Sequence, residues 1–196
     1  MYQRHEIILA SGSPRRKELL TQAGLTFRVL TADVDETPTV TEPAAVVEEL
    51  SRRKAEAVRK MRPSEAEAIV VAADTIVALD GEILGKPKDE DDAVRMLREL
   101  SGRTHEVYTG VTVLQVPGTE RVTFSNCTRV TFYRLSEEDI RDYVASGEPM
   151  DKAGSYGIQG LGVRFVERIK GDYNNVVGFP LAHFLRVLSE RGELVY

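Results

Sequence analysis

The sequence Ile7-Ile8-Leu9-Ala10-Ser11-Gly12-Ser13-Pro14 sets the architecture of the chain. Its leading apolar residues predict a short buried strand, and the turn after them opens a helix over residues 15–23. Ser13 is a favourable N-cap, and Pro14 suits the first helical turn. A second strand is expected over residues 27–30. A strand, a helix and a second strand in this order are typical of an α/β protein.

The same alternation continues to the end of the chain. We expect helices over residues 44–60, 90–100, 136–144 and 180–191, and strands over 69–73, 76–79, 107–115, 121–133 and 165–169. The first of these strands lacks polar alternation, which predicts a central strand covered on both faces. Asp80-Gly81 indicates a hairpin turn, and Met61-Arg62-Pro63 ends the helix before the central strand. Because there is no internal repeat or low-complexity linker, we expect one domain over residues 1–196.

Composition and charge narrow the range of functions. The chain has 196 residues, of which 42% are hydrophobic and 29% charged, as in globular proteins. The formal net charge of −5 argues against a general nucleic-acid-binding surface, because such binding depends on a basic face. A local basic site for a small anion is compatible with this balance.

Cys127 is the single cysteine, so the chain forms no intrachain disulfide and no cysteine-rich metal site. It stands in a strand-like run, and we interpret it as a core residue rather than a nucleophile. The apolar run at residues 7–10 is too short for a signal peptide, and no run approaches the roughly 20 residues of a membrane span. We therefore expect a cytoplasmic protein without a membrane partner.

The first turn, Ser11-Gly12-Ser13-Pro14-Arg15-Arg16, is a candidate anion site. Backbone N–H groups at the start of a helix and a nearby arginine pair both suit phosphate oxygens. The alternative is an ordinary capped helix with solvated arginines. The segment matches neither the P-loop nor the GxGxxG fingerprint, so both common nucleotide-binding templates fail.

Carboxylates and a lysine form a second group of candidates. Asp74 ends the apolar run at residues 69–73, where ligands bind in open α/β sheets, although an aspartate there can also cap its own turn. Lys86 stands in a stiff loop between Gly85 and Pro87. Asp35 and Glu36 could bind a hard cation such as Mg²⁺, or belong to a solvated acidic loop.

A basic run and a glycine-rich segment complete the candidates. Arg52-Arg53-Lys54 lies within a helix, so its side chains point in different directions and at most one or two face a cleft. The segment at residues 151–160 surrounds Gln159 with glycines. An amide pairs a donor with an acceptor and so reads a base edge, unless it only satisfies the backbone of a tight loop.

Six segments follow one another in an order known from one family. They are Leu9-Ala10-Ser11-Gly12-Ser13-Pro14-Arg15-Arg16, Ser51-Arg52-Arg53-Lys54-Ala55, Ala73-Asp74-Thr75, Gly85-Lys86-Pro87, Leu100-Ser101-Gly102-Arg103-Thr104-His105 and Gly171-Asp172-Tyr173-Asn174-Asn175-Val176-Val177-Gly178. Together they resemble the Maf family of nucleoside triphosphate pyrophosphatases, over nearly the whole chain. The resemblance implies a homodimer and a two-lobed mixed sheet flanked by helices around a central cleft, like that of inosine triphosphate pyrophosphatases.

The resemblance also implies roles for individual residues. Asp74 would be the general base that activates water, and Glu36 with Asp74 would bind a divalent metal cation, Mg²⁺ or Mn²⁺. The substrate-binding residues would be Ser11, Arg16, Lys54 and Lys86 at the phosphates, and Arg15, Thr75 and Gln159 at the base.

The resemblance of a further segment implies the substrate. Tyr156-Gly157-Ile158-Gln159-Gly160 is similar to the branch that hydrolyses dTTP and UTP to the monophosphate and pyrophosphate. Such an enzyme would act in nucleotide-pool housekeeping, and its substrates could include modified pyrimidine nucleotides. The alternative is a non-catalytic nucleotide-sensing module that contacts cell-division machinery. Asp74→Asn separates the two, because a catalyst loses turnover whereas a sensor keeps its phenotype.

Overall fold

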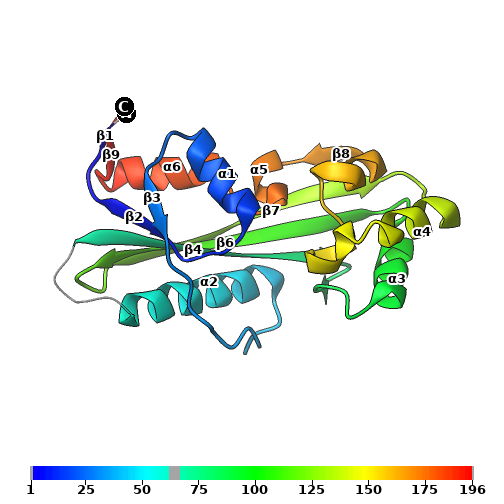
Figure 1. Cartoon of the computed structure of the whole chain (residues 1–196), viewed down its shortest axis with the longest axis horizontal. Helices are drawn as coiled ribbons and strands as arrows, with labels where there is room; N and C mark the ends of the chain where they lie inside the picture. The colour runs from blue at the N-terminus through cyan, green and yellow to red at the C-terminus, as the bar shows by residue number, and fades with distance from the viewer. Residues whose placement is uncertain (1, 62–66, 196) are drawn as a thin grey trace.

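The computed structural model describes residues 2–61 and 67–195 as a mixed sheet with helices on both faces (Figure 1). The strands are β1 (Tyr2–Gln3), β2 (Glu6–Leu9), β3 (Phe27–Val29), β4 (Ala68–Leu79), β5 (Glu82–Leu84), β6 (Thr104–Val116), β7 (Arg121–Phe132), β8 (Val166–Lys170) and β9 (Leu194–Val195). The α-helices are α1 (Pro14–Gln22), α2 (Pro43–Lys60), α3 (Glu90–Leu100), α4 (Glu137–Ala145), α5 (Tyr173–Val177) and α6 (Leu181–Glu190). Short 3-10 helices are η1 (Glu148–Asp151), η2 (Ala153–Ser155) and η3 (Gly160–Phe165).

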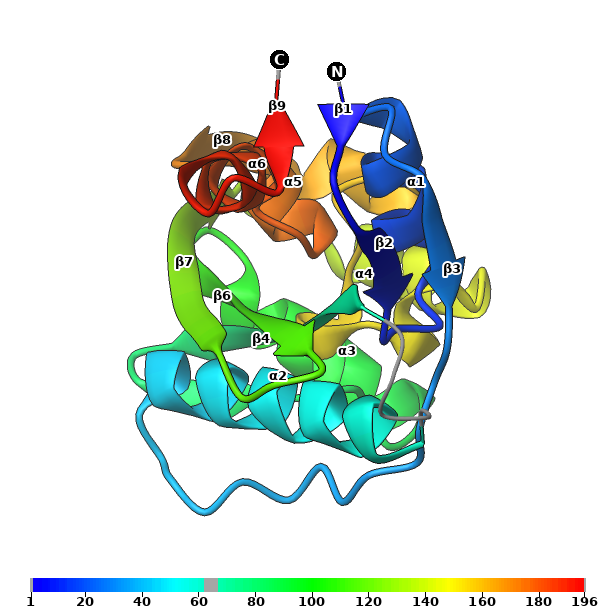
Figure 2. The ribbon, with the colours of Figure 1, turned by 90° about the vertical axis from the view of Figure 1, so that its left-hand side faces the viewer.

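The order of strands in the main sheet is β3-β2-β4-β6-β7-β8, with β5 paired to β4. The pairs that β2 forms with β3 and β4 are parallel, and the remaining pairs are antiparallel. Helix α2 covers one face of the sheet, while α1, α5 and α6 cover the other (Figure 2). The long strands continue past these layers toward α3 and α4, at the other end of the molecule (Figure 1). The mixed α/β sheet flanked by helices that the sequence predicted is therefore confirmed.

Strand β4 is the centre of the sheet and is buried on both faces. Ile69, Val71 and Ala73 belong to the core under α1 and α6, whereas Val70 and Ala72 pack toward Ala55 and Val58 of α2. This two-sided burial explains why the sequence shows no polar alternation here.

The position predicted for Asp74 was wrong in one respect. We expected the strand to end at Asp74, but β4 runs on without interruption to Leu79. The antiparallel neighbour β6 pairs with it from Ala68 to Ala78, with Gly110 opposite Asp74. The parallel neighbour β2, in contrast, stops at Leu9 opposite Val71. Asp74 therefore lies beyond the carboxyl end of β2, in the middle of its own strand.

Other predictions meet the structure with small differences. Ser13 stands at the N-cap of α1 as expected, but its side chain makes no capping hydrogen bond. Cys127 is exposed, so its interpretation as a core residue was wrong: along β7 it alternates with the buried Thr128. Helix α2 ends at Lys60, and the breaker Arg62-Pro63 lies outside the described residues. Within the described part of the chain, no helix is long and apolar enough to cross a membrane.

Candidate active site

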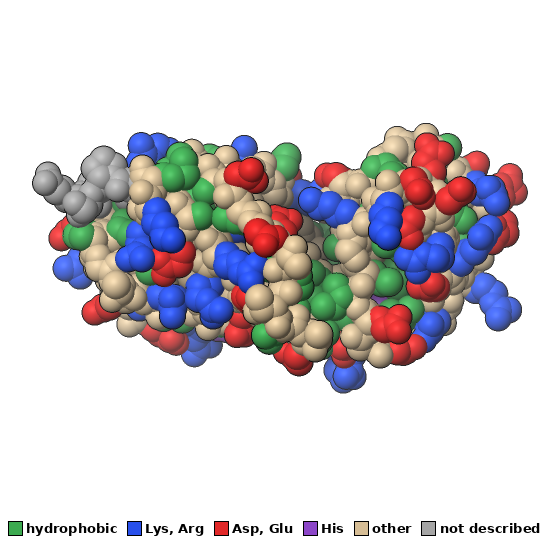
Figure 3. Space-filling model, turned by 90° about the horizontal axis from the view of Figure 1, so that it is seen from below, with side chains coloured by type: hydrophobic (Ala, Val, Ile, Leu, Met, Phe, Trp, Pro, Cys, Tyr) green, Lys and Arg blue, Asp and Glu red, His purple; other side chains and the backbone are tan. Residues whose placement is uncertain are grey.

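A cleft of about 1310 Å³ opens in the middle of the molecule (Figure 3). Its walls come from the start of α1, the loop after β3, α2, β4 and the segment from η1 to η3. Every residue that the sequence singled out as a site residue lines it, namely Ser11, Arg15, Arg16, Glu36, Lys54, Asp74, Thr75, Lys86 and Gln159. The fold thus brings together side chains that are far apart in the sequence.

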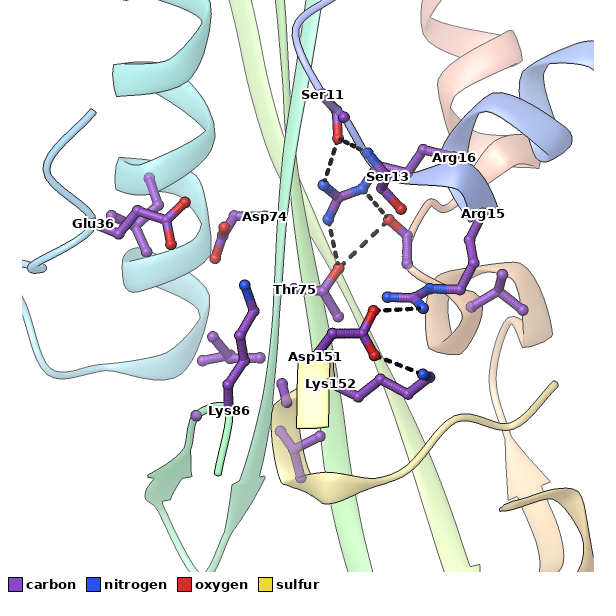
Figure 4. A pocket seen from close by; sticks show the side chains of 18 of the residues that line it. Ser11, Ser13, Arg15, Arg16, Glu36, Asp74, Thr75, Lys86, Asp151 and Lys152 are labelled. Carbon is purple, nitrogen blue, oxygen red and sulfur yellow. Dashed lines mark hydrogen bonds and ion pairs between the residues drawn. The ribbon is translucent and has the colours of Figure 1, made fainter. Parts of the chain in front are cut away.

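Lys54 joins two carboxylates on one side of the cleft. Its Nζ lies 2.5 Å from Asp74 Oδ1 and 2.8 Å from Glu36 Oε1. The hydrogen bond from Lys54 lowers the pKa of Glu36 below its ordinary value, so this carboxylate is ionised at neutral pH. Lys86, in the loop after β5, extends toward Asp74 (Figure 4). Two carboxylates and two lysines therefore lie close together in this part of the cleft.

Arg16 of α1 connects the turn before α1, strand β4 and the residue that follows α5. Its Nε donates to the Gly178 carbonyl at 2.8 Å, and its terminal nitrogens donate to Ser11 Oγ at 3.0 Å and Thr75 Oγ1 at 3.1 Å (Figure 4). Burial lowers the pKa of Arg16, but a guanidinium remains protonated at neutral pH. Arg16 therefore fixes the first turn against β4 and contributes positive charge to the cleft.

The loop that carries Glu36 is held by α2. Arg53 donates to the carbonyls of Asp35 and Thr37, on either side of Glu36, at 3.1 and 2.6 Å. Glu49 accepts hydrogen bonds from the amide and the hydroxyl of Thr39 at 2.9 and 2.7 Å. Of the basic run, Lys54 thus faces the cleft, and Arg53 is bound to the loop rather than solvated as part of a charged face.

The sequence pointed to the segment at residues 151–160 but gave a role only to Gln159, not to the acidic side chains in and near it. Asp151 lies 3.7 Å from the Arg15 guanidinium across the cleft and accepts a hydrogen bond from Lys152 at 2.7 Å (Figure 4). Glu148 also lines the cleft. Gln159 is exposed to it, and within the described residues its side chain has no hydrogen-bond partner. The interpretation of Gln159 as a side chain that only satisfies its own loop is therefore wrong.

The donor set fits a hard divalent cation bound together with a ligand. Asp74 and Glu36 share one cation already, the Lys54 ammonium, so their oxygens converge on positive charge. Among the described residues no group of three or more His, Cys, Asp and Glu side chains converges as an all-protein metal site. Mg²⁺ is commonly held by one or two carboxylates plus substrate phosphates, and Asp74 with Glu36 would supply these carboxylates.

The chain is similar to one group of known proteins over nearly its whole length. The family model described as Maf-like protein matches residues 6–191. A relative from Pelotomaculum thermopropionicum, named dTTP/UTP pyrophosphatase, is 50% identical over 188 residues, which cover 95% of this chain and 97% of the relative. A relative of the same name from Bacillus cereus is 52% identical over 186 residues, 94% of this chain and 95% of its own. A HAM1 protein from Coxiella burnetii has a TM-score of 0.53 at 14% identity over 95% of this chain and 99% of its own, which indicates a similar fold only.

Proposed function

The chain belongs to the Maf family, and we propose from this premise that it is a pyrophosphatase that hydrolyses dTTP and UTP. The products are the nucleoside monophosphate and pyrophosphate. The names of its relatives support the substrate, since two of them with half of their residues in common with this chain are named dTTP/UTP pyrophosphatase. The observation that carries the chemistry is the contact of Lys54 with both Asp74 and Glu36 in the cleft.

Asp74 is the residue we assign as general base. In the reaction, a water oxygen forms a bond to phosphorus, the P–O bond between the α- and β-phosphates breaks, and pyrophosphate leaves. The carboxylate of Asp74 takes the proton of the water. Its buried position on β4 fixes its orientation, and Lys54 Nζ donates a hydrogen bond to its Oδ1 at 2.5 Å.

The phosphates are assigned to the basic side chains of the cleft. Lys54, Lys86 and Arg16 supply positive charge, and Ser11 with the start of α1 supplies neutral donors. A bound Mg²⁺ or Mn²⁺, held by Asp74 and Glu36, would neutralise phosphate charge further. Phosphoryl transfer depends mainly on such charge stabilisation and positioning, so no covalent nucleophile is required.

The base is assigned to a second set of side chains that line the cleft. Arg15, Thr75 and Gln159 form this set, and the amide of Gln159 offers a donor and an acceptor to a pyrimidine edge. Removing one partner of a buried hydrogen bond costs about 1–3 kcal/mol, which is enough for selectivity between bases. We further propose one domain that acts as a homodimer in the cytoplasm, as the family resemblance implies.

A substrate panel tests this function. Wild-type protein is incubated with dTTP, UTP, CTP and GTP, with Mg²⁺, with Mn²⁺ and with a chelator, and the products are separated by ion chromatography. We expect monophosphate and pyrophosphate from dTTP and UTP, and no turnover with the chelator. If no triphosphate is turned over while UTP still binds, the nucleotide-sensing alternative replaces the enzyme.

A further inference from the structure

Residues 157–162, which include Gln159, are held by two side chains from outside the segment. Glu148 Oε2 accepts a hydrogen bond from the Leu161 amide at 3.0 Å, and Glu148 Oε1 accepts one from the Gly162 amide at 3.3 Å. The Gly157 amide donates to the hydroxyl of Tyr143 at 3.1 Å, and that hydroxyl donates to Glu148 Oε1 at 2.9 Å. Glu148 and Tyr143 therefore hold the backbone on both sides of Gln159.

The glycines of the segment allow this close approach. Gly160 has a φ of +77°, and a Cβ on it would lie 2.8 Å from Glu148 Oε2. A Cβ on Gly162 would lie 2.4 Å from the Gly157 carbonyl oxygen and 2.9 Å from the Tyr143 hydroxyl. The glycine pattern of the sequence is thus required by the Glu148 carboxylate and the Tyr143 hydroxyl, in addition to the turn.

The carboxylate of Glu148 is suited to hold amides. Burial alone would raise its pKa, but the hydrogen bonds from the Leu161 amide, the Tyr143 hydroxyl and the Gly162 amide lower it below the ordinary value. An ionised carboxylate is a stronger acceptor than a neutral group. Gln159 has no side-chain partner within the described residues, so its place in the cleft depends on the backbone that Glu148 holds.

The same part of the chain also reaches Arg15. Lys152 Nζ donates to the Glu148 carbonyl at 2.6 Å and to Asp151 Oδ1 at 2.7 Å, and Asp151 faces Arg15 across the cleft (Figure 4). A displacement of Glu148 would therefore reach Arg15, one of the side chains that we assign to the base. Among the residues that the structure describes, no hydrogen bond or ion pair joins the Lys54, Asp74 and Glu36 cluster to this network.

We propose that Glu148 is a positioning residue for base selectivity, which acts by holding the backbone on both sides of Gln159 through its carboxylate and the Tyr143 hydroxyl. This inference rests on the proposed function, because it takes Gln159 as the residue that reads the base. It assigns Glu148 no contact with the reacting phosphates.

The test compares Glu148→Gln and Tyr143→Phe with the control Glu138→Gln, an exposed carboxylate on α4. The glutamine variant keeps the size of the side chain but turns an N–H toward donor groups, so the loop loses an acceptor. We expect the ratio of kcat/KM for UTP to that for GTP to fall about tenfold, through a raised KM for UTP with kcat nearly unchanged. Tyr143→Phe should shift the ratio in the same direction, and the double variant should add little, because both act on one network.

Two further measurements separate a positioning role from a general loss of structure. Inorganic tripolyphosphate, which probes only the phosphate half of the cleft, should inhibit Glu148→Gln and wild type equally. Gly160→Ala, which places a methyl group against the same carboxylate, should lower the UTP to GTP ratio as well. An unchanged ratio in Glu148→Gln overturns the inference, and so does an equal loss of tripolyphosphate and UTP binding.

Binding measurements test the role of Glu148 separately from the proposed reaction. If wild type hydrolyses neither dTTP nor UTP, dissociation constants for UTP and GTP are measured in the Asp74→Asn background, with and without Glu148→Gln. A fall in the UTP preference on Glu148→Gln then supports the positioning role without the reaction. Equal preferences in both variants overturn the role as well.

Discussion

Lys54 of α2 and Asp74 of β4 meet at 2.5 Å between Nζ and Oδ1, although one lies in a helical layer and the other in the central strand. Both side chains are largely shielded from water, with 16% and 13% of their surfaces exposed. The contact therefore depends on how closely α2 approaches the sheet. It also ties the side chain proposed as base to one proposed as a phosphate ligand.

Lys54→Met is expected to lower kcat/KM for UTP by about 10²-fold or more, because it removes a positive charge from the phosphate site and leaves Asp74 without its cation. Steady-state kinetics measures the loss. Lys60→Met is the matched control, since Lys60 is an exposed lysine on the same helix. Equal kinetics for the two variants would exclude a role for Lys54 at the phosphates.

Gly110→Ala is expected to destabilise the packing of α2 against the sheet. Gly110 pairs with Asp74 in the sheet, and a Cβ on it would lie 2.4 Å from the backbone of Val47 in α2. The helix would have to move outward, at a cost of about 1–3 kcal/mol in the free energy of unfolding. Chemical denaturation measures this cost, with Gly85→Ala as the control, because no described atom beyond its chain neighbours lies within 4 Å of a Cβ there. A Gly110→Ala variant as stable as the control would show that α2 does not need this close approach.

The elements of the fold were largely predictable from local patterns. Helix α3 begins and ends where the sequence indicated, because apolar spacing and end signals agree there. Helix α5 was missed, since the segment from Tyr173 to Val177 is too short to show a helical period. The uninterrupted course of β4 through Asp74 was also missed, because a polar pair within a strand looks like its end. The pairing with β6 continues the strand through Asp74, and β5 pairs with its last residues.

Arg53→Met tests the loop that carries Glu36. Without Arg53 the carbonyls of Asp35 and Thr37 lose their donor, so the loop is expected to move more freely. We expect faster amide hydrogen exchange over residues 33–42 and an apparent Mg²⁺ requirement raised about tenfold. Arg52→Met, the neighbouring substitution, should leave both quantities at wild-type values. Exchange rates that do not change in Arg53→Met would argue against this function of the contact.

The buried imidazole of His105 is expected to lower the free energy of unfolding in acid. Burial lowers its pKa from 6.5 to about 3, and its Nε2 lies 2.7 Å from the Tyr156 hydroxyl. Between these two values the unfolded chain binds a proton that the folded chain does not, so stability falls as the pH falls. From pH 7 to pH 5 this group alone removes about 2 kcal/mol from the free energy of unfolding.

The measurement is urea denaturation of wild type and His105→Gln at both pH values. The variant is expected to be less stable at pH 7, because it loses the contact with Tyr156, but to lose about 2 kcal/mol less than wild type on acidification. The same acid loss in both proteins would show that His105 does not stay neutral in the folded state.

The sequence indicated those residues of the candidate site whose own side-chain group suggests contact with a ligand. Asp74, Lys54 and Gln159 were found because a carboxylate, a lysine or an amide in such a motif suggests a ligand. Glu148 was not found, since its partners are the backbone amides of Leu161 and Gly162. A backbone amide is present in nearly every residue, so the sequence does not show which amides bind a side chain. Nearby glycines indicate a close approach, but only the folded loop shows that the approaching side chain is Glu148.

The most direct test of the proposed reaction is to identify the products of UTP hydrolysis by wild type and by Asp74→Asn with ion chromatography. The binding of UTP to the variant is measured at the same time. We expect UMP and pyrophosphate from wild type, and no turnover by Asp74→Asn although it still binds UTP. UDP and orthophosphate from wild type, or unchanged turnover by the variant, would show that the α–β bond or the role of Asp74 had been assigned wrongly.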